Sequence, residues 1–170
     1  MGAEDRMTLR VREAYPNCPK YITRRELAGL ENVPPVSLEE GHSLTRDQQI
    51  AFESTDILFI ASRHPERGSD ASHRGGNPGF VQSSSDREVC FPDYAGNSMF
   101  NTFGNLEIDS RAGMLLPDFN RGRALAISGN AAVNYEHDGR NRQMRLAIQR
   151  WSWISLPLIE TRRELSPFNP

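Results

Sequence analysis

The residues with the strongest chemical character lie together near the middle of the chain. A serine, a histidine and an arginine, Ser72, His73 and Arg74, are followed directly by two glycines, Gly75 and Gly76. Arginine binds phosphate or carboxylate through paired hydrogen bonds, serine and histidine donate further bonds, and glycines let backbone N–H groups approach a ligand. This pattern predicts a phosphate-binding segment or, equally well from composition alone, a glycine turn with a solvated arginine.

A second group of candidates lies where an expected strand ends and an expected helix begins. Pro92 and Asp93 close the strand, and Asn97 and Ser98 stand at the predicted start of the helix. The N-terminus of a helix has unpaired N–H groups and a partial positive charge, which suit a phosphate. The alternative is that Asn97 or Ser98 only caps the helix.

Further polar side chains follow on that helix, but no residue is marked as a catalytic nucleophile. Asn101, Thr102 and Asn105 share roughly one helical face, which either contacts a ligand or faces solvent or packing neighbours. The sequence contains no GxSxG, HExxH, GxGxxG or P-loop motif, and its four histidines lack metal-ligand spacing. We therefore expect no metal site, and the catalytic residues are unknown.

The elements that must position these side chains are mostly short strands. Residues 57–61 form a continuous apolar run typical of a buried strand, and Thr45 with Gln48 has the spacing of a capping box. Gly129 marks a bulge or sharp bend, and Arg150 breaks the alternation of the last strand, which is consistent with a second bulge. We expect strands over 57–61, 79–82, 89–91, 112–116, 123–128, 131–135 and 145–154, turns over 63–70, 70–76, 83–87 and 118–122, a linker or loop over 29–41, and helices over 8–15, 45–54 and 97–108.

Strand–turn–strand spacing without regular crossover helices predicts an antiparallel barrel rather than a doubly wound α/β sheet. With 170 residues, the chain is long enough for one domain with a sizeable core. We expect an N-terminal helical or loop extension over 1–43, a barrel domain over 44–155, and an extended C-terminal tail over 156–170.

Composition and charge exclude several classes of partner. The formal net charge is −2, so no basic field is present to attract nucleic acid. No apolar run approaches the ~20 residues that span a bilayer, and the N-terminus lacks the apolar region of a signal peptide. Two cysteines far apart in the sequence, Cys18 and Cys90, suit reduced thiols. These features predict a cytoplasmic protein that binds neither nucleic acid nor membranes.

Four ordered motifs carry a resemblance to a known family. They read NCPKYI, SHRGGNPGFV, FPDYAGNSMFNTFGNL and RAGMLLPDF, and a helix precedes the strand segment DILFIAS. In these motifs the chain resembles the flavin-nucleotide-binding proteins related to pyridoxamine 5'-phosphate oxidase. The resemblance covers roughly residues 15–133, and it is specific for the fold and less so for the cofactor.

The resemblance implies a mainly β fold, a six-stranded antiparallel split β-barrel with a few flanking helices. It also implies a homodimer that binds FMN at the subunit interface and acts on a small-molecule substrate. Arg74 would be the phosphate ligand, while Asn97 and Ser98 replace an arginine–lysine pair that holds the FMN phosphate in the oxidases. The cofactor contacts that the resemblance implies are Ser72, His73, Arg74, Gly75, Gly76, Phe80, Val81, Phe91, Pro92, Asp93, Asn97, Ser98 and Asn101.

Three functions remain open at this stage. The first is an FMN-dependent oxidoreductase that transfers a hydride or electrons, without activity on pyridoxamine 5'-phosphate itself, because the basic motif for the substrate phosphate is not evident near the C-terminus. The second is a non-catalytic flavin carrier or sensor, which the missing cation pair favours. The third keeps the barrel and changes the ligand to deazaflavin or haem.

Overall fold

The structure is a computed structural model that describes residues 8, 10–11, 18–29, 36–96, 98–135 and 142–170. Most of the helix expected over 8–15 lies outside the described residues, and so does Asn97. None of the helices in the described ranges is long and apolar enough to cross a membrane.

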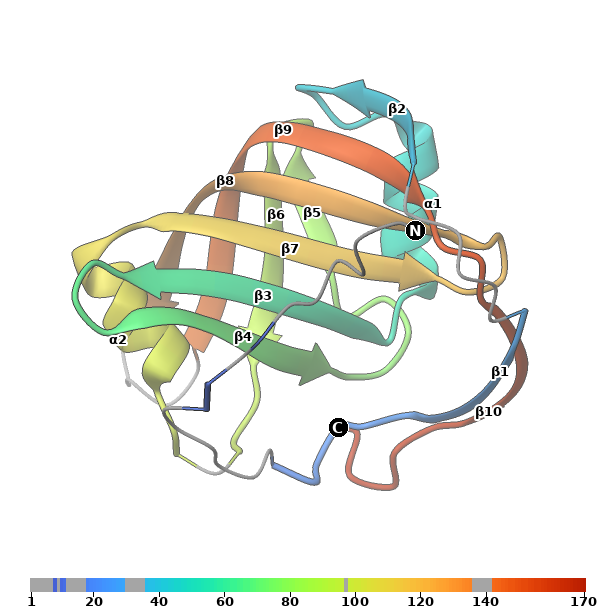
Figure 1. The fold of residues 1–170 in the computed structure, drawn as a ribbon, viewed down its shortest axis with the longest axis horizontal. Coiled ribbons are helices and arrows are strands. Elements are labelled where there is room, and N and C mark those ends of the chain that lie inside the picture. The colour runs from blue at the N-terminus through green and yellow to red at the C-terminus, as the bar shows by residue number, and fades with distance from the viewer. Residues whose placement is uncertain (1–7, 9, 12–17, 30–35, 97, 136–141) are drawn as a thin grey trace, which may run out of the picture.

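Eight of the ten described strands form one antiparallel sheet that bends round on itself without closing (Figure 1). The strand order is β4-β3-β7-β8-β9-β6-β5, and β2 also pairs with β9. The sheet therefore has eight strands, and the expected count of six was wrong. Its strands are β2 Ser37–Gly41, β3 Ile57–His64, β4 Gly68–Gly75, β5 Gln82–Ser85, β6 Glu88–Asp93, β7 Arg111–Asp118, β8 Arg123–Tyr135 and β9 Arg142–Ser155.

The longest ladder, between β8 and β9, contains the bulge that lets the sheet bend. The register shifts after Ser128, at Gly129, where Gln149 of β9 has no partner residue on β8. A Cβ on Gly129 would lie 1.9 Å from the carbonyl oxygen of Ala147, so only glycine fits there. Both expected bulges, at Gly129 and beside Arg150, are thus confirmed as one irregularity shared by two strands.

The core fills the concave side of this sheet. Along β9, Leu146 and Ile148 are buried before the bulge, and Trp151 and Trp153 are buried after it. The extra residue at the bulge changes which alternate positions face inward, because side chains in a strand alternate between two faces. On β3, Leu58 and Ile60 are fully buried, as the apolar run predicted.

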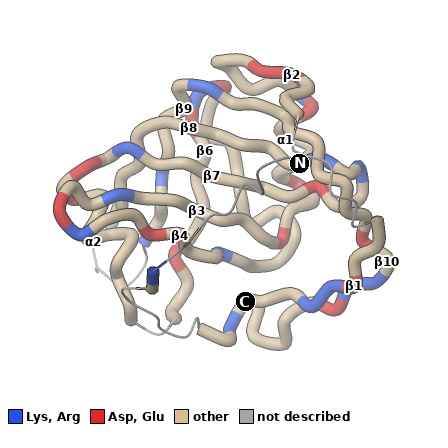
Figure 2. Tube along the Cα trace, in the orientation of Figure 1, with Lys and Arg blue, Asp and Glu red and all other residues tan. Residues whose placement is uncertain are grey.

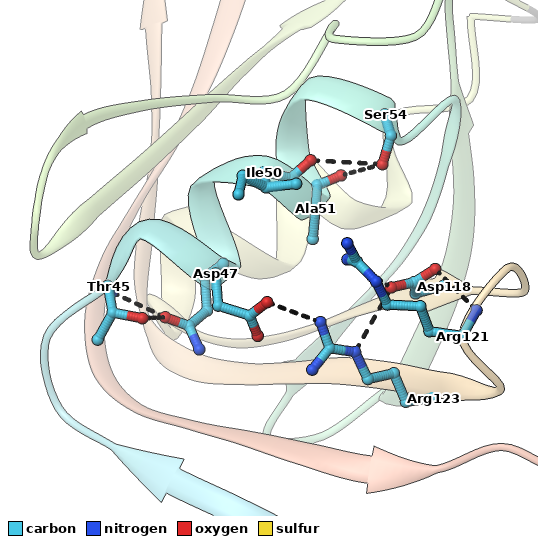
Figure 3. A network of polar contacts seen from close by, with 9 residues as sticks. Thr45, Asp47, Ile50, Ala51, Ser54, Asp118, Arg121 and Arg123 are labelled. Atoms are coloured by element: carbon cyan, nitrogen blue, oxygen red, sulfur yellow. Dashed lines mark hydrogen bonds and ion pairs between the residues drawn. The ribbon is translucent and has the colours of Figure 1, made fainter.

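The helix expected at residue 45 is confirmed as α1, Arg46–Ser54, with the predicted capping box between Thr45 and Gln48. Figure 3 shows Asp47, on its first turn, reaching Arg123 at the start of β8, and Arg123 lies 3.5 Å from Asp118 at the end of β7. These ion pairs hold the helix against one end of the barrel. Burial lowers the pKa of Arg123 but its carboxylate partners outweigh this, so the net shift is upward.

The second helix, α2, covers Asn101–Ile108 and begins four residues later than predicted. Phe100 occupies its N-cap position and makes no side-chain cap hydrogen bond. The prediction that this helix begins at residue 97 was therefore wrong, since Ser98 lies outside the helix, and phosphate binding by Asn97 or Ser98 stays a prediction.

Several local predictions around these strands were wrong. The expected glycine turn over 70–76 is mostly strand β4, which pairs with β3 from Ile57–Gly75 to His64–Gly68. Residues 79–81 of the strand expected over 79–82 lie outside any strand. Residues 83–85 of the turn expected over 83–87 belong to strand β5, which ends at Ser85. Residues 37–41 of the expected loop form β2. Strands β4 and β5 each pair with a neighbouring strand of the chain, and β2 pairs with the distant strand β9.

A second, two-stranded sheet stands beside the barrel (Figure 1). Its strands are β1, Arg24–Ala28, and β10, Ile159–Glu164. We call this pair the arm. The arm is joined to the barrel by Arg25, which pairs with Asp56 just before β3 and lies 2.7 Å from Glu160 of β10. The C-terminal tail expected over 156–170 is mostly exposed, and part of it is the paired strand β10.

Candidate functional site

A cleft opens between strand β4, the end of β6, the start of α2 and the segment 18–21 that leads into the arm. The empty space between its walls, with the open solvent at its mouth included, is about 780 Å³. Its walls carry both charged and aromatic side chains. The lining residues are Cys18, Lys20, Tyr21, Asp70, Ala71, Ser72, His73, Arg74, Gly75, Pro92, Asp93, Tyr94, Gly96, Met99, Asn101 and Thr102.

The structure brings seven of the residues predicted from the sequence to this cleft: Ser72, His73, Arg74, Gly75, Pro92, Asp93 and Asn101. Five others do not line it. Phe80, Val81 and Phe91 are buried in the barrel core, and the rings of Phe80 and Phe91 pack edge to face. Gly76 packs against Phe80, and Ser98 is exposed with a φ of 60°. Asn97 lies outside the described residues.

The strongest charges of the cleft form one cluster, Arg74–Asp93–Arg142, which we call the cleft cluster. Nε of Arg142 lies 2.8 Å from one carboxylate oxygen of Asp93, and an NH1 atom of Arg74 lies 3.6 Å from the other. Asp93 is the last residue of β6 and faces Arg142, the first residue of β9. Arg74 comes from β4, so the cluster joins an edge strand of the open sheet to β6 and β9.

Aromatic rings lie under both arginines of this cluster. The guanidinium of Arg142 lies 5.0 Å from the ring centre of Phe100, and that of Arg74 lies 5.8 Å from the ring centre of Phe103. The two rings stack on each other at 5.7 Å. Burial lowers the pKa of Arg74, and the carboxylates of Asp93 and Asp70 oppose that shift. An arginine stays protonated regardless, so both groups remain cations.

His73 stands beside the cluster on the opposite face of β4. Its ring packs edge to face on Phe59, with centres 6.0 Å apart, and its Nε2 is buried without a hydrogen-bond partner. Burial first, and then the positive charges of Arg74 and Arg25, lower the pKa of His73 below its ordinary value of 6.5. The imidazole is therefore neutral at pH 7, with hydrogen-bonding capacity left over.

The two glycines after Arg74 serve close packing of the protein on itself. A Cβ on Gly75 would lie only 2.0 Å from the carbonyl oxygen of Tyr21, and one on Gly76 would lie 2.9 Å from the ring of Phe80. Gly75 thus lets the segment 18–21 dock against the end of β4, and Gly76 leaves room for the ring of Phe80. The sequence predicted that both glycines admit a ligand, and of the two only Gly75 lines the cleft.

Two tyrosines of the cleft were not found from the sequence. Tyr21 has a φ of 64° and donates a hydrogen bond through its hydroxyl to the carbonyl of Ala95 at 2.9 Å. Its ring centre lies 5.3 Å from that of Tyr94. Burial and the neighbouring Tyr21 raise the pKa of Tyr94, so its hydroxyl keeps its proton at physiological pH. A tyrosine at positive φ has no sequence signal, although Tyr94 stands within the FPDY motif.

The amides and hydroxyls of α2 point in more than one direction. Thr102 is buried and donates a hydrogen bond to Asp70 at 3.1 Å, and Asn105 donates one to Ser62 at 3.0 Å. Asn101 lines the cleft. Of the three side chains whose role was left open, Thr102 and Asn105 therefore bind strands β4 and β3.

Arg142 is the residue of the cleft cluster that the sequence pointed to least. It lies outside the motifs, beyond a segment with no distinctive pattern, and joins the cleft cluster only because β6 and β9 pair. In the described ranges no three His, Cys, Asp or Glu side chains are grouped so that they could hold a metal ion. In the view of Figure 2, basic and acidic positions are interspersed over the described trace.

Comparison with known proteins identifies a shared fold. No protein-family model and no curated protein sequence matches the chain. A candidate pyridoxamine 5'-phosphate oxidase from Lactobacillus delbrueckii superposes with a TM-score of 0.53 at 12% identity, over 68% of this chain and 97% of that chain. HupZ of Group A Streptococcus superposes at 0.51, with 12% identity over 64% and 98%, and in a second structure at 0.50, with 10% identity over 64% and 93%. Identities this low relate the folds alone.

Proposed function

We propose that this chain binds FMN in the cleft and uses it for redox chemistry with a small substrate. The observation that carries the proposal is the convergence of two separate motifs. Residues 72–75 of β4 and residues 92–93 of β6 lie far apart in the sequence, and both line one cleft with Asn101 of α2. The fold shared with a candidate pyridoxamine 5'-phosphate oxidase supports the same reading as an analogy.

The chemistry of the lining fits the parts of FMN. Tyr21 and Tyr94 offer aromatic surface for a flat ring system, and Ser72 and Asn101 offer hydroxyl and amide groups for a ribityl chain. Nε2 of His73 and Nε of Arg74 are buried polar atoms without hydrogen-bond partners in the described structure. Buried polar atoms are normally paired, so these two atoms call for partners that the described residues do not supply.

Flavin, when bound, supplies the capacity to accept and return a hydride or electrons. The chain's own task is then to bind and orient. Arg74 is the cation placed for the phosphate, and Arg142 supports it from β9 through Asp93. Neutral His73 and protonated Tyr94 can each hold a hydrogen bond without changing charge near pH 7. No side-chain nucleophile is required.

We further propose that the protein is a homodimer. On the convex side of the sheet, Phe59 is 39% exposed in the middle of β3, and its partners across the ladders are His73 and Leu115. Ala61 lies two residues further, opposite Ala71. Such an apolar patch on a strand in mid-sheet suits a second copy, which would then cover the side of the cleft that His73 borders.

The visible absorption spectrum of the purified protein tests the cofactor directly. We expect a flavin spectrum that persists after FMN is added and the protein is desalted, with FMN identified after denaturation. Arg74→Ala should weaken FMN binding, and equal binding by wild type and variant would remove the phosphate assignment. A colourless protein that retains no FMN would contradict the proposal.

The dimer is tested separately by light scattering during size-exclusion chromatography. We expect a mass of about two chains for the wild type. Ala61→Arg, on the convex side of β3, should shift the mass to one chain, because a charge cannot be buried unpaired at an interface. A wild-type protein of one-chain mass would contradict the dimer and leave the cleft as it is.

A non-catalytic flavin carrier or sensor is the second candidate, and one observation favours it. The charged lining residues are Lys20 and Arg74 against Asp70 and Asp93, so the cleft offers no excess of positive charge to hold a phosphate tightly. Steady turnover with a reduced nicotinamide donor would rule this candidate out. Flavin binding and release without turnover would support it.

A further inference from the structure

In the cleft cluster, two arginines share one carboxylate. Asp93 is only 8% exposed, and its two oxygens face Arg142 at 2.8 Å and Arg74 at 3.6 Å. Each arginine side chain is 23% exposed. The carboxylate therefore occupies the place between the two guanidinium groups that an anionic ligand group would otherwise take, because both bind the same N–H donors.

The carboxylate does not use all the donors. Nε of Arg74 is buried and has no hydrogen-bond acceptor in the described structure. The longer of the two ion pairs is the one to Arg74, and this arginine lines the cleft whereas Arg142 does not. Arg74 is thus the arginine of the cleft cluster that lines the cleft, and Asp93 is a carboxylate 3.6 Å away that competes for it.

We infer that Asp93 is a specificity residue that limits the negative charge of the ligand group accepted beside Arg74. A carboxylate at this place repels a doubly charged phosphate and leaves an uncharged hydroxyl unaffected. The inference rests on the proposed function, which makes a flavin the ligand. It goes beyond that function by stating which charge the ligand group beside Arg74 carries. The cleft accordingly discriminates little between FMN and riboflavin, which differ by that phosphate.

The test measures dissociation constants of FMN and riboflavin by fluorescence quenching, for the wild type and for Asp93→Asn. The substitution keeps the shape of the side chain and removes its charge. We expect FMN to bind on the order of tenfold more tightly to the variant, and riboflavin to bind within about twofold of the wild type. Adding Arg74→Gln to Asp93→Asn should cancel the gain for FMN.

A matched control is available at the far end of the barrel. Asp118 also closes a strand, is also mostly buried, and also lies between two arginines, Arg121 at 3.4 Å and Arg123 at 3.5 Å. Asp118→Asn should leave both dissociation constants unchanged. A gain of FMN affinity in this variant as well would show a general effect of net charge and overturn the inference.

Other outcomes separate the inference from the proposed function. Unchanged or weaker FMN binding by a folded Asp93→Asn protein overturns the inference while flavin binding stands. If Asp93→Asn does not fold, the wild type decides, since an FMN preference over riboflavin above ~100-fold contradicts the inference. If neither flavin binds, the proposed function fails, and titration with inorganic phosphate decides: tighter binding by Asp93→Asn supports the inference, and no change overturns it.

Discussion

The arm and the cleft each depend on a cluster of arginines and carboxylates, but the two clusters are built differently. At the arm, Arg25 and Arg163 face two carboxylates, Asp56 and Glu160, so the charges balance within the cluster. Asp56 is only 2% exposed. In the cleft cluster two arginines share Asp93, and both are partly exposed. A buried cluster whose charges balance fixes the fold, whereas a partly exposed cluster beside a cavity is available to a ligand.

The largest expected effect breaks the arm cluster. Asp56→Ala leaves the guanidinium of Arg25 buried without its main partner, and removal of one member of a buried ion pair costs about 3–5 kcal/mol. We expect the free energy of unfolding, measured by urea denaturation, to fall by that amount. Glu53→Ala is the control, because its ion pair with Arg46 is exposed on both sides and should contribute less than about 1 kcal/mol. Equal losses in the two variants would mean that the arm cluster is not a fixed point of the fold.

The next largest effect lies where the arm meets the cleft. Gly75→Ala places a Cβ 2.0 Å from the carbonyl oxygen of Tyr21, so the segment that leads into the arm must move. Forced overpacking of this kind costs about 1–3 kcal/mol. We expect a lower melting temperature together with altered fluorescence of Tyr21 and Tyr94. Wild-type stability for Gly75→Ala would show that the segment 18–21 does not dock against β4.

A smaller effect, of opposite sign, is expected in α2 at the cleft. A Cβ on Gly104 would meet no atom within 4 Å, so nothing in the packing requires glycine there. Gly104→Ala should raise the free energy of unfolding by about 0.5–1 kcal/mol, since alanine loses less backbone freedom on folding and favours the helix. A loss of stability, measured by urea denaturation under the same conditions as for Gly75→Ala, would contradict the open space described beside α2.

The smallest effect at neutral pH concerns His73, which feels the positive charge of both clusters. Its pKa is lowered in the folded protein, mainly by burial, so the unfolded chain binds more protons below pH 6.5. His73 therefore lowers stability progressively as the pH falls below 6.5, and has no such effect above it. We expect His73→Gln to flatten the fall of melting temperature between pH 6.5 and 5. Parallel curves for wild type and variant would contradict the lowered pKa.

Local signals in the sequence predicted the parts of the fold that depend on neighbours in the chain. The capping box was confirmed because it depends on two residues three positions apart, Thr45 and Gln48. The bulge at Gly129 was confirmed because a glycine inside a strand marks such a site. Strand β4 was mistaken for a turn. Its residues are small or polar, and only its pairing with β3 makes it a strand.

The sequence predicted the residues of the candidate site that lie in the motifs, and it missed residues that contact them. Arg74 and Asp93 were singled out, and the structure places both in the cleft. Arg142 and Tyr21 were not singled out. Arg142 lies beside Asp93 because of the register in which β6 pairs with β9, and Tyr21 has a positive φ that its residue type does not predict. That these residues bind FMN stays a prediction.

The pairing of β1 with β10 has a consequence for how the chain folds. Thr161 donates its hydroxyl to the carbonyl of Glu26, 135 positions away, whereas β8 and β9 follow each other directly along the chain. Closing a long loop costs more entropy than closing a short one, so contacts between distant segments form late and slowly. We therefore expect the β8–β9 hairpin to form early and the arm to join last. Hydrogen exchange during refolding should protect the amides of β8 and β9 before those of β1, and simultaneous protection would contradict this order.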